Sequence, residues 1–527
     1  MSKTTPIAII GTGFAGLGMA IKLKEAGFED FVILEQGNDV GGTWRDNHYP
    51  GCACDVQSAL YSFSFEQNPN WSRMYAQQSE ILDYLRHCAE KYDLKRHIRF
   101  NTHVAGAHFD EKRNQWTVET ASSPEMWAYM QKHDLKPGEA LDRDDLELPA
   151  FNTLTARVLI SGMGGLSTPA YPNLPGLDAF EGKRFHSQDW DHQYDLKGKR
   201  VAVIGTGASA IQFVPELAKE VARLDLYQRT PPWIMPKPDR EMKSWEKAVF
   251  RRVPAAQSAL RNKIYWQLES RVLALALNPR LMKIAELEAR RHIRSQIPGK
   301  ALRKAVTPDY TIGCKRILLS NNYYPALAQS NVDVLTDGIG EIRAHSIVDS
   351  NGVEREVDAI IFGTGFKAQE PVPAQMIFGR NGEDLLDAWK EGAEAYKGTT
   401  VNGFPNFFML VGPNTGLGHS SMVYMIESQI QYVMSALTRM KQEGWEAVEV
   451  AEKAQSKYNA MLQSKSGDSV WQSGCNSWYI NENGKNTTLW PSFTWAFRQQ
   501  TSQFDAEHYH CETSATLKAV AGEALPA

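Results

Sequence analysis

Two glycine-rich turns give this chain of 527 residues its clearest chemical signal. They are Gly11-Thr12-Gly13-Phe14-Ala15-Gly16 and Gly205-Thr206-Gly207-Ala208-Ser209-Ala210. Because glycine has no side chain, a pyrophosphate can approach the backbone N–H groups of such a turn and the positive end of the helix that follows it. The small third residue, glycine in one turn and alanine in the other, lets the helix pack on its strand. The two turns therefore predict two dinucleotide sites.

One residue downstream of each turn indicates which nucleotide is bound. Glu35 follows Gly11 by 24 residues, and Arg229 follows Gly205 by the same interval. A carboxylate here accepts hydrogen bonds from the ribose hydroxyls of an unphosphorylated adenosine, whereas an arginine binds a 2′-phosphate through forked, charge-assisted hydrogen bonds. The first site is therefore predicted to bind FAD and the second NADPH. One such turn is weak evidence, but two with matched spacing are hard to attribute to chance.

Short apolar runs flank each turn and are typical of buried parallel strands. The first turn is followed by a predicted helix to about Ala26, and the second by apolar residues at helical spacing from Ile211 to Ala218. Strand, turn, helix and strand begin a Rossmann-like domain, so we predict an α/β fold with two such domains and a helical insertion. The four predicted strands are Ile7–Ile10, Phe31–Leu34, Val201–Ile204 and Leu224–Tyr227.

The order of these patterns predicts the domain limits. Prolines at 169, 172 and 175 mark an exposed connection, and the segment from Glu241 to about Lys304 has apolar residues at helical spacing. Residues 122–149 are polar and rich in Asp, Glu and Lys, which predicts a surface insertion. We therefore assign residues 1–155 and 366–527 to an FAD-binding domain, 170–238 and 306–365 to an NADPH-binding domain, and 239–305 to the helical insertion.

The composition narrows the class of protein. A net charge of −4 and a pI near 6.4 argue against nucleic acid or an anionic membrane as the main partner. The N-terminus has no basic-then-apolar signal, and no apolar run approaches the length needed to span a bilayer. We expect a soluble cytoplasmic protein without a metal site.

Six cysteines in such a chain predict no disulfide framework. Cys52 and Cys54 form a CxC pattern, which differs from the CxxxxC pattern of flavin disulfide reductases. We interpret them as small buried thiols rather than a redox dithiol.

Between the two turns lies the segment Phe180–Asp191, FEGKRFHSQDWD. It resembles the FxGxxxHxxxW(P/D) fingerprint of type I Baeyer–Villiger monooxygenases at every fixed position. Related N- and S-oxygenating flavin monooxygenases typically have Phe or Tyr in place of Trp190, so this residue favours the ketone-oxidising branch. A second family pattern, GGxWxxxx(F/Y)PGxxxD, matches from Gly41 to Asp55, and Asn476–Tyr479 resembles the family's segment near the nicotinamide. The resemblance covers nearly the whole chain except residues 122–149 and the extreme C-terminus.

The resemblance also implies roles for individual residues. Asp55 and Arg316 look like the family's active-site pair beside the flavin, although by residue type alone they could form an ordinary salt bridge. Arg229, Thr230 and Lys315 resemble the contacts to the 2′-phosphate. His186 is interpreted as a hinge or hydrogen-bonding residue. The other residues assigned to cofactor binding are Gly11, Gly13, Gly16, Glu35, Gly42, Trp44, Tyr61, Gly205, Gly207, Ala210 and Trp478.

The implied reaction uses FAD, NADPH and O2. NADPH would reduce the flavin, and a flavin peroxide would then attack a ketone carbonyl to give an ester or lactone. A fixed guanidinium at Arg316 would stabilise the peroxide anion, with Asp55 orienting the guanidinium. Two alternatives remain open: an N- or S-oxygenase on the same scaffold, and a reductase or redox sensor that binds both nucleotides without oxygenating a substrate.

Overall fold

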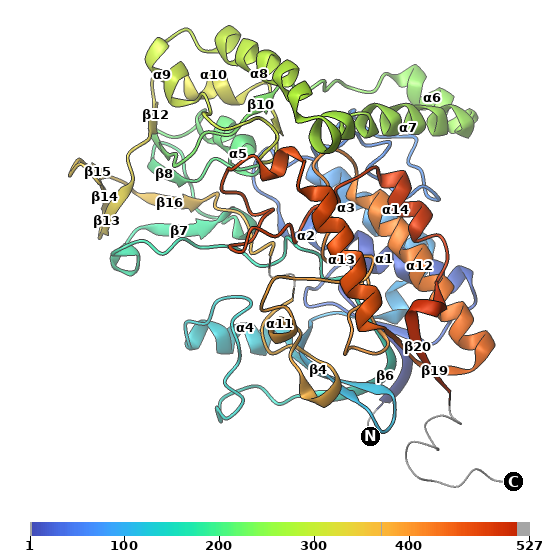
Figure 1. The fold of residues 1–527 in the computed structure, drawn as a ribbon. Helices are drawn as coiled ribbons and strands as arrows, with labels where there is room; N and C mark the ends of the chain where they lie inside the picture. Colours follow the sequence, from blue (N-terminus) through green and yellow to red (C-terminus); the bar gives the residue numbers. More distant parts are fainter. Residues whose placement is uncertain (1–2, 370–371, 514–527) are drawn as a thin grey trace, which may run out of the picture.

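The computed structural model describes residues 3–369 and 372–513, which form two α/β units (Figure 1). The first unit contains an eight-stranded sheet in the order β17-β4-β5-β6-β1-β2-β3, with β18 also paired to β6. Its central strand β1 is parallel to both β2 and β6, whereas β5 is antiparallel to both its neighbours. The strands are β1 (Lys3–Ile10), β2 (Phe31–Leu34), β3 (Ile98–Arg99), β4 (Thr102–Asp110), β5 (Gln115–Ser122), β6 (Asn152–Ser161), β17 (Ile377–Phe378) and β18 (Phe407–Met409).

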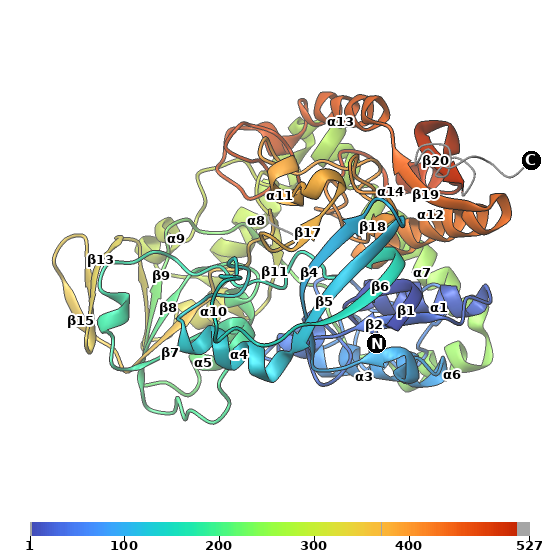
Figure 2. The same cartoon turned by 90° about the horizontal axis from the view of Figure 1, so that it is seen from below.

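The second unit contains a five-stranded parallel sheet in the order β12-β9-β8-β16-β7. A three-stranded antiparallel sheet, β13-β14-β15, lies at its outer edge (Figure 2). The strands are β7 (Lys183–His186), β8 (Arg200–Ile204), β9 (Arg223–Tyr227), β12 (Val332–Leu335), β13 (Ile339–Arg343), β14 (Ser346–Asp349), β15 (Glu354–Glu356) and β16 (Ala359–Phe362). All four strands predicted around the two turns are confirmed.

Helices cover both sheets and form a separate layer between residues 244 and 305. Helix α1 packs against the long helix α12, whose first turn is capped by the Ser421 hydroxyl accepting a hydrogen bond from the Val423 amide. The predicted helical segment is confirmed as α6 to α9, which lie together at the top of Figure 1. The principal helices are α1 (Phe14–Glu25), α2 (Thr43–Asp46), α3 (Gln78–Lys91), α4 (Ser123–Lys132), α5 (Ala210–Leu217), α6 (Ser244–Arg252), α7 (Pro254–Glu269), α8 (Met282–Gln296), α9 (Lys300–Ala305), α12 (Met422–Glu443), α13 (Glu452–Ser466) and α14 (Thr494–Gln500).

Both glycine turns are built in the same way. The first glycine has a φ of +92° at Gly11 and +108° at Gly205, a region that side-chain-bearing residues avoid. A Cβ atom would lie 2.9 Å from the Gly162 carbonyl oxygen in the first turn and 2.4 Å from that of Gly363 in the second. The glycines are therefore required by backbone conformation and by close contact with the strand next to β1 or β8.

One prediction from the sequence was incomplete and another was wrong. Residues 122–149 are largely exposed, as expected of a surface insertion, but α4 also buries Met126, Tyr129 and Met130 in a small core of its own. The predicted absence of disulfides was wrong, since Cys314 and Cys475 form one. The disulfide joins segments 161 residues apart, and cysteine spacing does not report such a contact.

Candidate active site

A cavity of about 700 Å³ opens along the first glycine turn. This volume lies within the usual range of ligand sites. Segments from Ile10 to Thr488 line it, so distant parts of the chain meet here. The lining includes most of the residues predicted to contact the flavin, among them Gly11, Gly13, Glu35, Gly42, Trp44 and Tyr61, together with Arg316 and Trp478.

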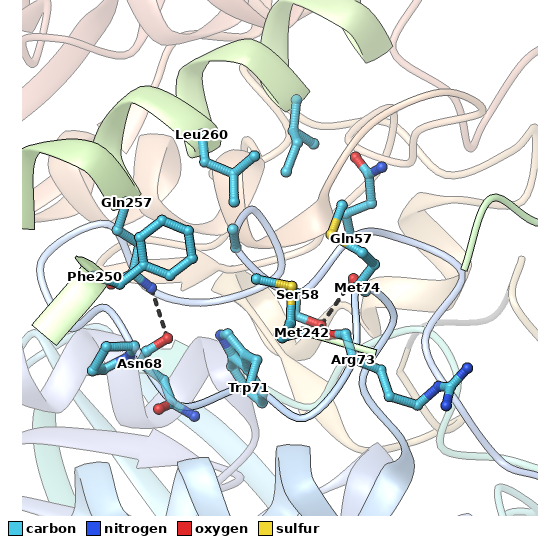
Figure 3. A pocket seen from close by; sticks show the side chains of 13 residues that line it. Gln57, Ser58, Asn68, Trp71, Arg73, Met74, Met242, Phe250, Gln257 and Leu260 are labelled. Atoms are coloured by element: carbon cyan, nitrogen blue, oxygen red, sulfur yellow. Dashed lines mark hydrogen bonds between the residues drawn. The ribbon is translucent and has the colours of Figure 1, made fainter. Parts of the chain in front are cut away.

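A second, much smaller cavity lies between residues 57–74 and helix α7 (Figure 3). Its volume of about 10 Å³ holds about one water molecule. Trp71, Phe250 and Leu260 line it, and Gln257 crosses one side with a hydrogen bond of 2.6 Å from Nε2 to the carbonyl oxygen of Asn68. This space is a gap in the packing of α7 and is too small for a substrate.

The large cavity fits a dinucleotide because two glycine backbones meet at its wall. Gly42 faces Gly13 so closely that a Cβ atom on Gly42 would lie 3.2 Å from the Gly13 Cα atom. Gly16 does not line the cavity; a Cβ atom there would lie 1.9 Å from the carbonyl oxygen of Gly11, so its role is to let α1 pack on the turn. The backbone at Gly11–Gly13 is thus left open to a pyrophosphate.

Glu35 lies at the cavity wall but already has four protein donors. One carboxylate oxygen accepts from the Thr12 amide at 2.9 Å and hydroxyl at 2.5 Å. The other accepts from the Gly37 amide and from Arg45, each at 2.7 Å. Burial alone would lower the pKa of Arg45, but the charges of Glu35 and Asp46 raise it above its ordinary value. Glu35 therefore holds the turn together, and a ribose hydroxyl has to share oxygens that are already in use.

Aromatic side chains form part of the cavity wall. The Trp44 indole donates a hydrogen bond of 3.2 Å to the Tyr61 hydroxyl, and their rings meet edge to face. Phe14, at the start of α1, contacts the Tyr61 ring with centroids 5.2 Å apart. The two predicted residues are thus brought together and held rigidly.

Asp55 and Arg316 form an ion pair although 261 residues separate them. Arg316 donates from Nη2 at 2.6 Å and from Nε at 3.2 Å to the same carboxylate oxygen. Burial raises the pKa of Asp55, but the charge and hydrogen bonds of Arg316 outweigh burial and the pKa is lowered. Asp55 in turn raises the pKa of Arg316 above its ordinary value. The pair is therefore fully ionised, and the Arg316 side chain remains 37% exposed.

The sequence analysis missed a second cation beside Asp55. Lys237 follows β10 (Ile234–Met235) and donates from Nζ to the Cys54 carbonyl oxygen at 3.2 Å. Its charge also lowers the pKa of Asp55, while burial lowers the pKa of Lys237 itself. No motif or spacing distinguishes this lysine in the sequence, because it reaches Asp55 only through the fold.

The second glycine turn lies outside the large cavity and is more open. Gly207 and Ala208 are exposed, as is Arg229 at the end of β9. Lys315 lies near Arg229. Burial lowers the pKa of Lys315, and the charge of Arg229 lowers it further. The Thr230 carbonyl oxygen accepts a hydrogen bond of 3.1 Å from the Thr206 hydroxyl, which ties the turn to this basic pair. Two neighbouring cations suit a doubly charged phosphate.

The disulfide links the two predicted cofactor regions. Cys314 directly precedes Lys315 and Arg316, and Cys475 lies three residues before Trp478. Trp478 lines the large cavity and is 43% exposed. The bond therefore fixes the C-terminal segment with Trp478 beside the segment with Arg316.

His186 lies at the connection between the two units. Its Nδ1 accepts a hydrogen bond of 3.1 Å from the Gln188 amide, and its ring contacts Tyr171 and Phe366. The two connecting segments pair nearby, with the Ala170 amide donating to the Gly365 carbonyl oxygen at 2.9 Å. Burial lowers the pKa of His186 to about 4, so the ring is neutral. Its place fits the predicted hinge, while its role stays a prediction.

The free thiols, possible metal ligands and helices of the described residues were also the subject of predictions from the sequence. Cys52 and Cys54 are buried free thiols, as predicted, and burial raises the pKa of Cys52 to about 12. Among residues 3–369 and 372–513, no group of three or more His, Cys, Asp or Glu side chains is placed to hold a metal ion. No helix in the same ranges has both the length and the apolar character to cross a membrane.

Comparison with known proteins identifies the class to which this fold and site belong. The profile of the flavin-binding monooxygenase-like family matches residues 4–379, and the chain belongs to that family. The structure resembles that of an oxidised steroid monooxygenase bound to NADP, with a TM-score of 0.81, 28% identity, and coverage of 97% of this chain and 100% of the other. It also resembles the OTEMO complex with FAD and NADP, with a TM-score of 0.80, 25% identity and the same coverage.

Within that class the relationship is closer still. A Baeyer–Villiger monooxygenase of Pseudomonas aeruginosa is 56% identical over 520 residues, which cover 98% of this chain and 93% of the relative. The chain is therefore an FAD- and NADPH-dependent flavin monooxygenase of the Baeyer–Villiger type, and the two dinucleotide-binding domains predicted from the turns are those of this family.

Proposed function

We propose that the large cavity holds FAD and that the ketone is oxidised beside Arg316. The turn from Gly11 to Gly16 would bind the FAD pyrophosphate, with Glu35 near the ribose. Gly42, Trp44 and Tyr61 would line the flavin. NADPH would be held at the second turn by Gly205, Gly207 and Ala210, with Arg229, Thr230 and Lys315 at the 2′-phosphate and Trp478 near the nicotinamide.

The domain limits follow from the same assignment. FAD would be bound by residues 1–155 and 366–527, NADPH by residues 170–238 and 306–365, and residues 239–305 would form the helical insertion. The two sheets support this division, because the strands of each come from the corresponding ranges with the exception of the end of β6. We place the enzyme in the cytoplasm, acting on a small ketone and O2.

FAD, when bound and reduced by NADPH, would activate O2 so that one of its oxygen atoms can be inserted next to the ketone carbonyl. The protein contributes the electrostatic field in which this oxygen reacts. Arg316 is permanently charged and partly open to the cavity, so it can stabilise negative charge that develops there. Asp55 binds one edge of the guanidinium and fixes its direction, and Lys237 helps to keep Asp55 ionised. A positioned, preorganised cation costs no reorganisation during the reaction.

The observation that carries this proposal is the Asp55–Arg316 pair, formed across 261 residues at the large cavity. Its decisive test is the Arg316→Ala variant. We expect FAD binding and NADPH oxidation to persist, while ester formation falls by about 100- to 1000-fold and oxygen leaves as hydrogen peroxide. Asp55→Ala should cause a similar but milder loss, because the guanidinium remains without its positioning partner.

The measurement is ester formed per NADPH oxidised, with ketones, sulfides and amines offered in parallel. Arg251→Ala, an exposed arginine on α6, is the matched control and should leave this ratio unchanged. An Arg316→Ala enzyme with the coupling of the wild type would sink the proposed role of Arg316. Oxygenation of the sulfides and amines alone would refute ketone oxidation.

A further inference from the structure

Residues 123–148 border the large cavity, although their composition predicts only a surface insertion. Helix α4 lies at the side of the first unit that faces the second (Figures 1 and 2). Trp127 and Met130 on α4, and Leu141 and Arg143 on the following loop, are part of the cavity wall. The proposed function assigns no role to this wall.

The segment is firmly anchored on the first sheet. Its backbone is joined to the sheet by the Ser123 amide, which donates to the Asn101 carbonyl oxygen at 2.9 Å. Arg143 donates from Nη2 to the Ala105 carbonyl oxygen and from Nη1 to Glu119, both at 2.8 Å. The Tyr129 hydroxyl donates to Asp145 at 2.9 Å, which closes the loop on α4. These contacts hold the loop in a defined position against the first sheet.

The far end of the segment reaches the connection between the two units. Gly138 has a φ of +86°, and a Cβ atom there would lie 3.1 Å from the Thr168 side chain. Gly138 and Thr168 both line the cavity. The segment thus extends from the start of β4 to the connection that follows β6, along one side of the cavity.

The position of β4 identifies which part of the cavity this wall covers. The amide of Thr102, the first residue of β4, donates to the backbone carbonyl oxygen of Glu35 at 2.9 Å. In the Rossmann arrangement the pyrophosphate lies at the glycine turn and the adenosine ribose at the acidic residue. The base must then lie beyond Glu35, on the side of residues 102–105. Thr102, His103, Val104 and Ala105 line the cavity with Arg143, which binds Ala105 directly.

Trp127 is the side chain in this wall that is best suited to contact a nucleobase. It is 42% exposed, whereas its neighbours Met126 and Met130 are buried in the core of the segment. A large aromatic side chain at a ligand cavity provides a surface on which any nucleobase can rest. The face of α4 that carries Trp127 is therefore available to a ligand without any loss of core packing.

Given that the large cavity holds FAD, we infer that residues 123–148 form a wall over its adenosine half, with Trp127 and Arg143 as the residues that retain it. Trp127 would cover the base, and Arg143 would hold the wall against β4. The segment would thereby set how tightly FAD is kept, without contact with the flavin ring or with the second turn. Arg143 acts as a positioning residue.

The test compares FAD with FMN, which lacks the adenosine half. Apoprotein of the wild type, Trp127→Ala and Arg143→Ala is titrated with each flavin by fluorescence. We expect the Kd for FAD to rise about 10-fold in Trp127→Ala, within the range found when an aromatic side chain beneath a base is removed. The Kd for FMN should stay within about 2-fold of the wild type, so the preference for FAD over FMN falls by about 5-fold or more.

Two controls distinguish a specific effect of this wall on FAD binding from a general loss of folding. Trp245→Ala removes another exposed tryptophan from α6, outside the lining of the cavity, and should leave both Kd values unchanged. The Kd for NADP+ should be unchanged in every variant, which also reports that the second unit is folded. Equal weakening of FAD and FMN, or an unchanged Kd for FAD in both Trp127→Ala and Arg143→Ala, overturns the inference. A wild-type apoprotein that fails to bind FAD refutes the proposed function itself.

Discussion

The two glycine turns share one backbone design but sit in different surroundings. In each turn a glycine with positive φ lies against a glycine of the neighbouring strand, Gly162 in one case and Gly363 in the other. The first turn opens on a cavity of about 700 Å³, and its acidic residue Glu35 is 3% exposed. The second turn has exposed residues, and its basic residue Arg229 is exposed too.

This difference fits the different tasks of the two nucleotides. On the proposed assignment, FAD stays on the enzyme through the catalytic cycle, and a site with a satisfied, buried carboxylate suits a resident group. NADPH has to exchange, and an open turn beside Arg229 and Lys315 allows binding without deep burial. The glycines thus define a dinucleotide site, while the exposure of the residue at the end of the second strand separates a resident cofactor from an exchangeable one.

Removal of Glu35 should have the largest effect. Glu35→Ala removes one of the two carboxylates that pair with Arg45, which is 15% exposed, and deprives the Thr12 amide of its acceptor. Breaking a buried ion pair costs up to about 3–5 kcal/mol, and the remaining pair with Asp46 offsets part of that loss here. We expect low yields of soluble protein and little bound FAD, measured as flavin absorbance per protein. Glu35→Gln keeps the shape and should be milder. Full FAD content in Glu35→Ala would show that retention of FAD does not depend on this carboxylate.

Removal of Arg229 should have a smaller and more selective effect. An exposed arginine supports no core contact, so Arg229→Ala should fold normally and keep FAD. Loss of one charge-assisted contact costs about 1.5–3 kcal/mol, or roughly 10- to 150-fold in affinity. We expect the KM for NADPH to rise by this factor, with little change in that for NADH.

Arg223→Ala makes a useful comparison for this result. Arg223 is the first residue of β9, which ends two residues before Arg229, and it pairs with Asp225 away from the turn. It should leave the ratio of the two KM values unchanged. Equal losses of NADPH and NADH binding in Arg229→Ala would place Arg229 elsewhere than at the 2′-phosphate.

Local patterns predicted the parts of the fold that depend on neighbours in sequence. The strands and helices around both turns follow from apolar spacing, and the resemblance to a known family pointed to Asp55 and Arg316 as a pair. The place of Lys237 beside Asp55 could not be predicted in this way. It depends on the path of the chain after β10, and a lysine in a proline-rich turn has no distinctive spacing.

The segment after β5 shows how composition can mislead. Residues 122–149 are polar on average, yet Met126, Tyr129 and Met130 fall at helical spacing on one face of α4. This spacing of three and four residues was available in the sequence and indicates a helix with a buried side. That the same helix lines the large cavity depends on the contact of Arg143 with β4, and no local pattern reports such a contact.

The titration of His186, at the connection between the two units, should have the smallest effect. It should appear as a dependence of the free energy of unfolding on pH. Burial lowers the pKa of His186 from 6.5 to about 4, so the folded protein keeps this ring neutral while the unfolded chain protonates it between these values. The contribution is present in full above pH 6.5 and is lost as the pH falls towards 4. Its slope is at most about 1.4 kcal/mol per pH unit.

His186→Gln removes this titration. Below pH 6.5 the free energy of unfolding should then fall less steeply with decreasing pH, by up to the slope that one proton contributes, as measured by urea unfolding across the pH range. His103 should keep part of the slope, because burial lowers its pKa to about 4 as well. His510→Gln, at an exposed position on β20 (Tyr509–Thr513), is the matched control and should follow the wild-type curve. A His186→Gln protein with the wild-type slope would mean that His186 is solvated and charged. In that case the connection between the two units would be open to water, unlike the buried carboxylate of Glu35 at the first turn.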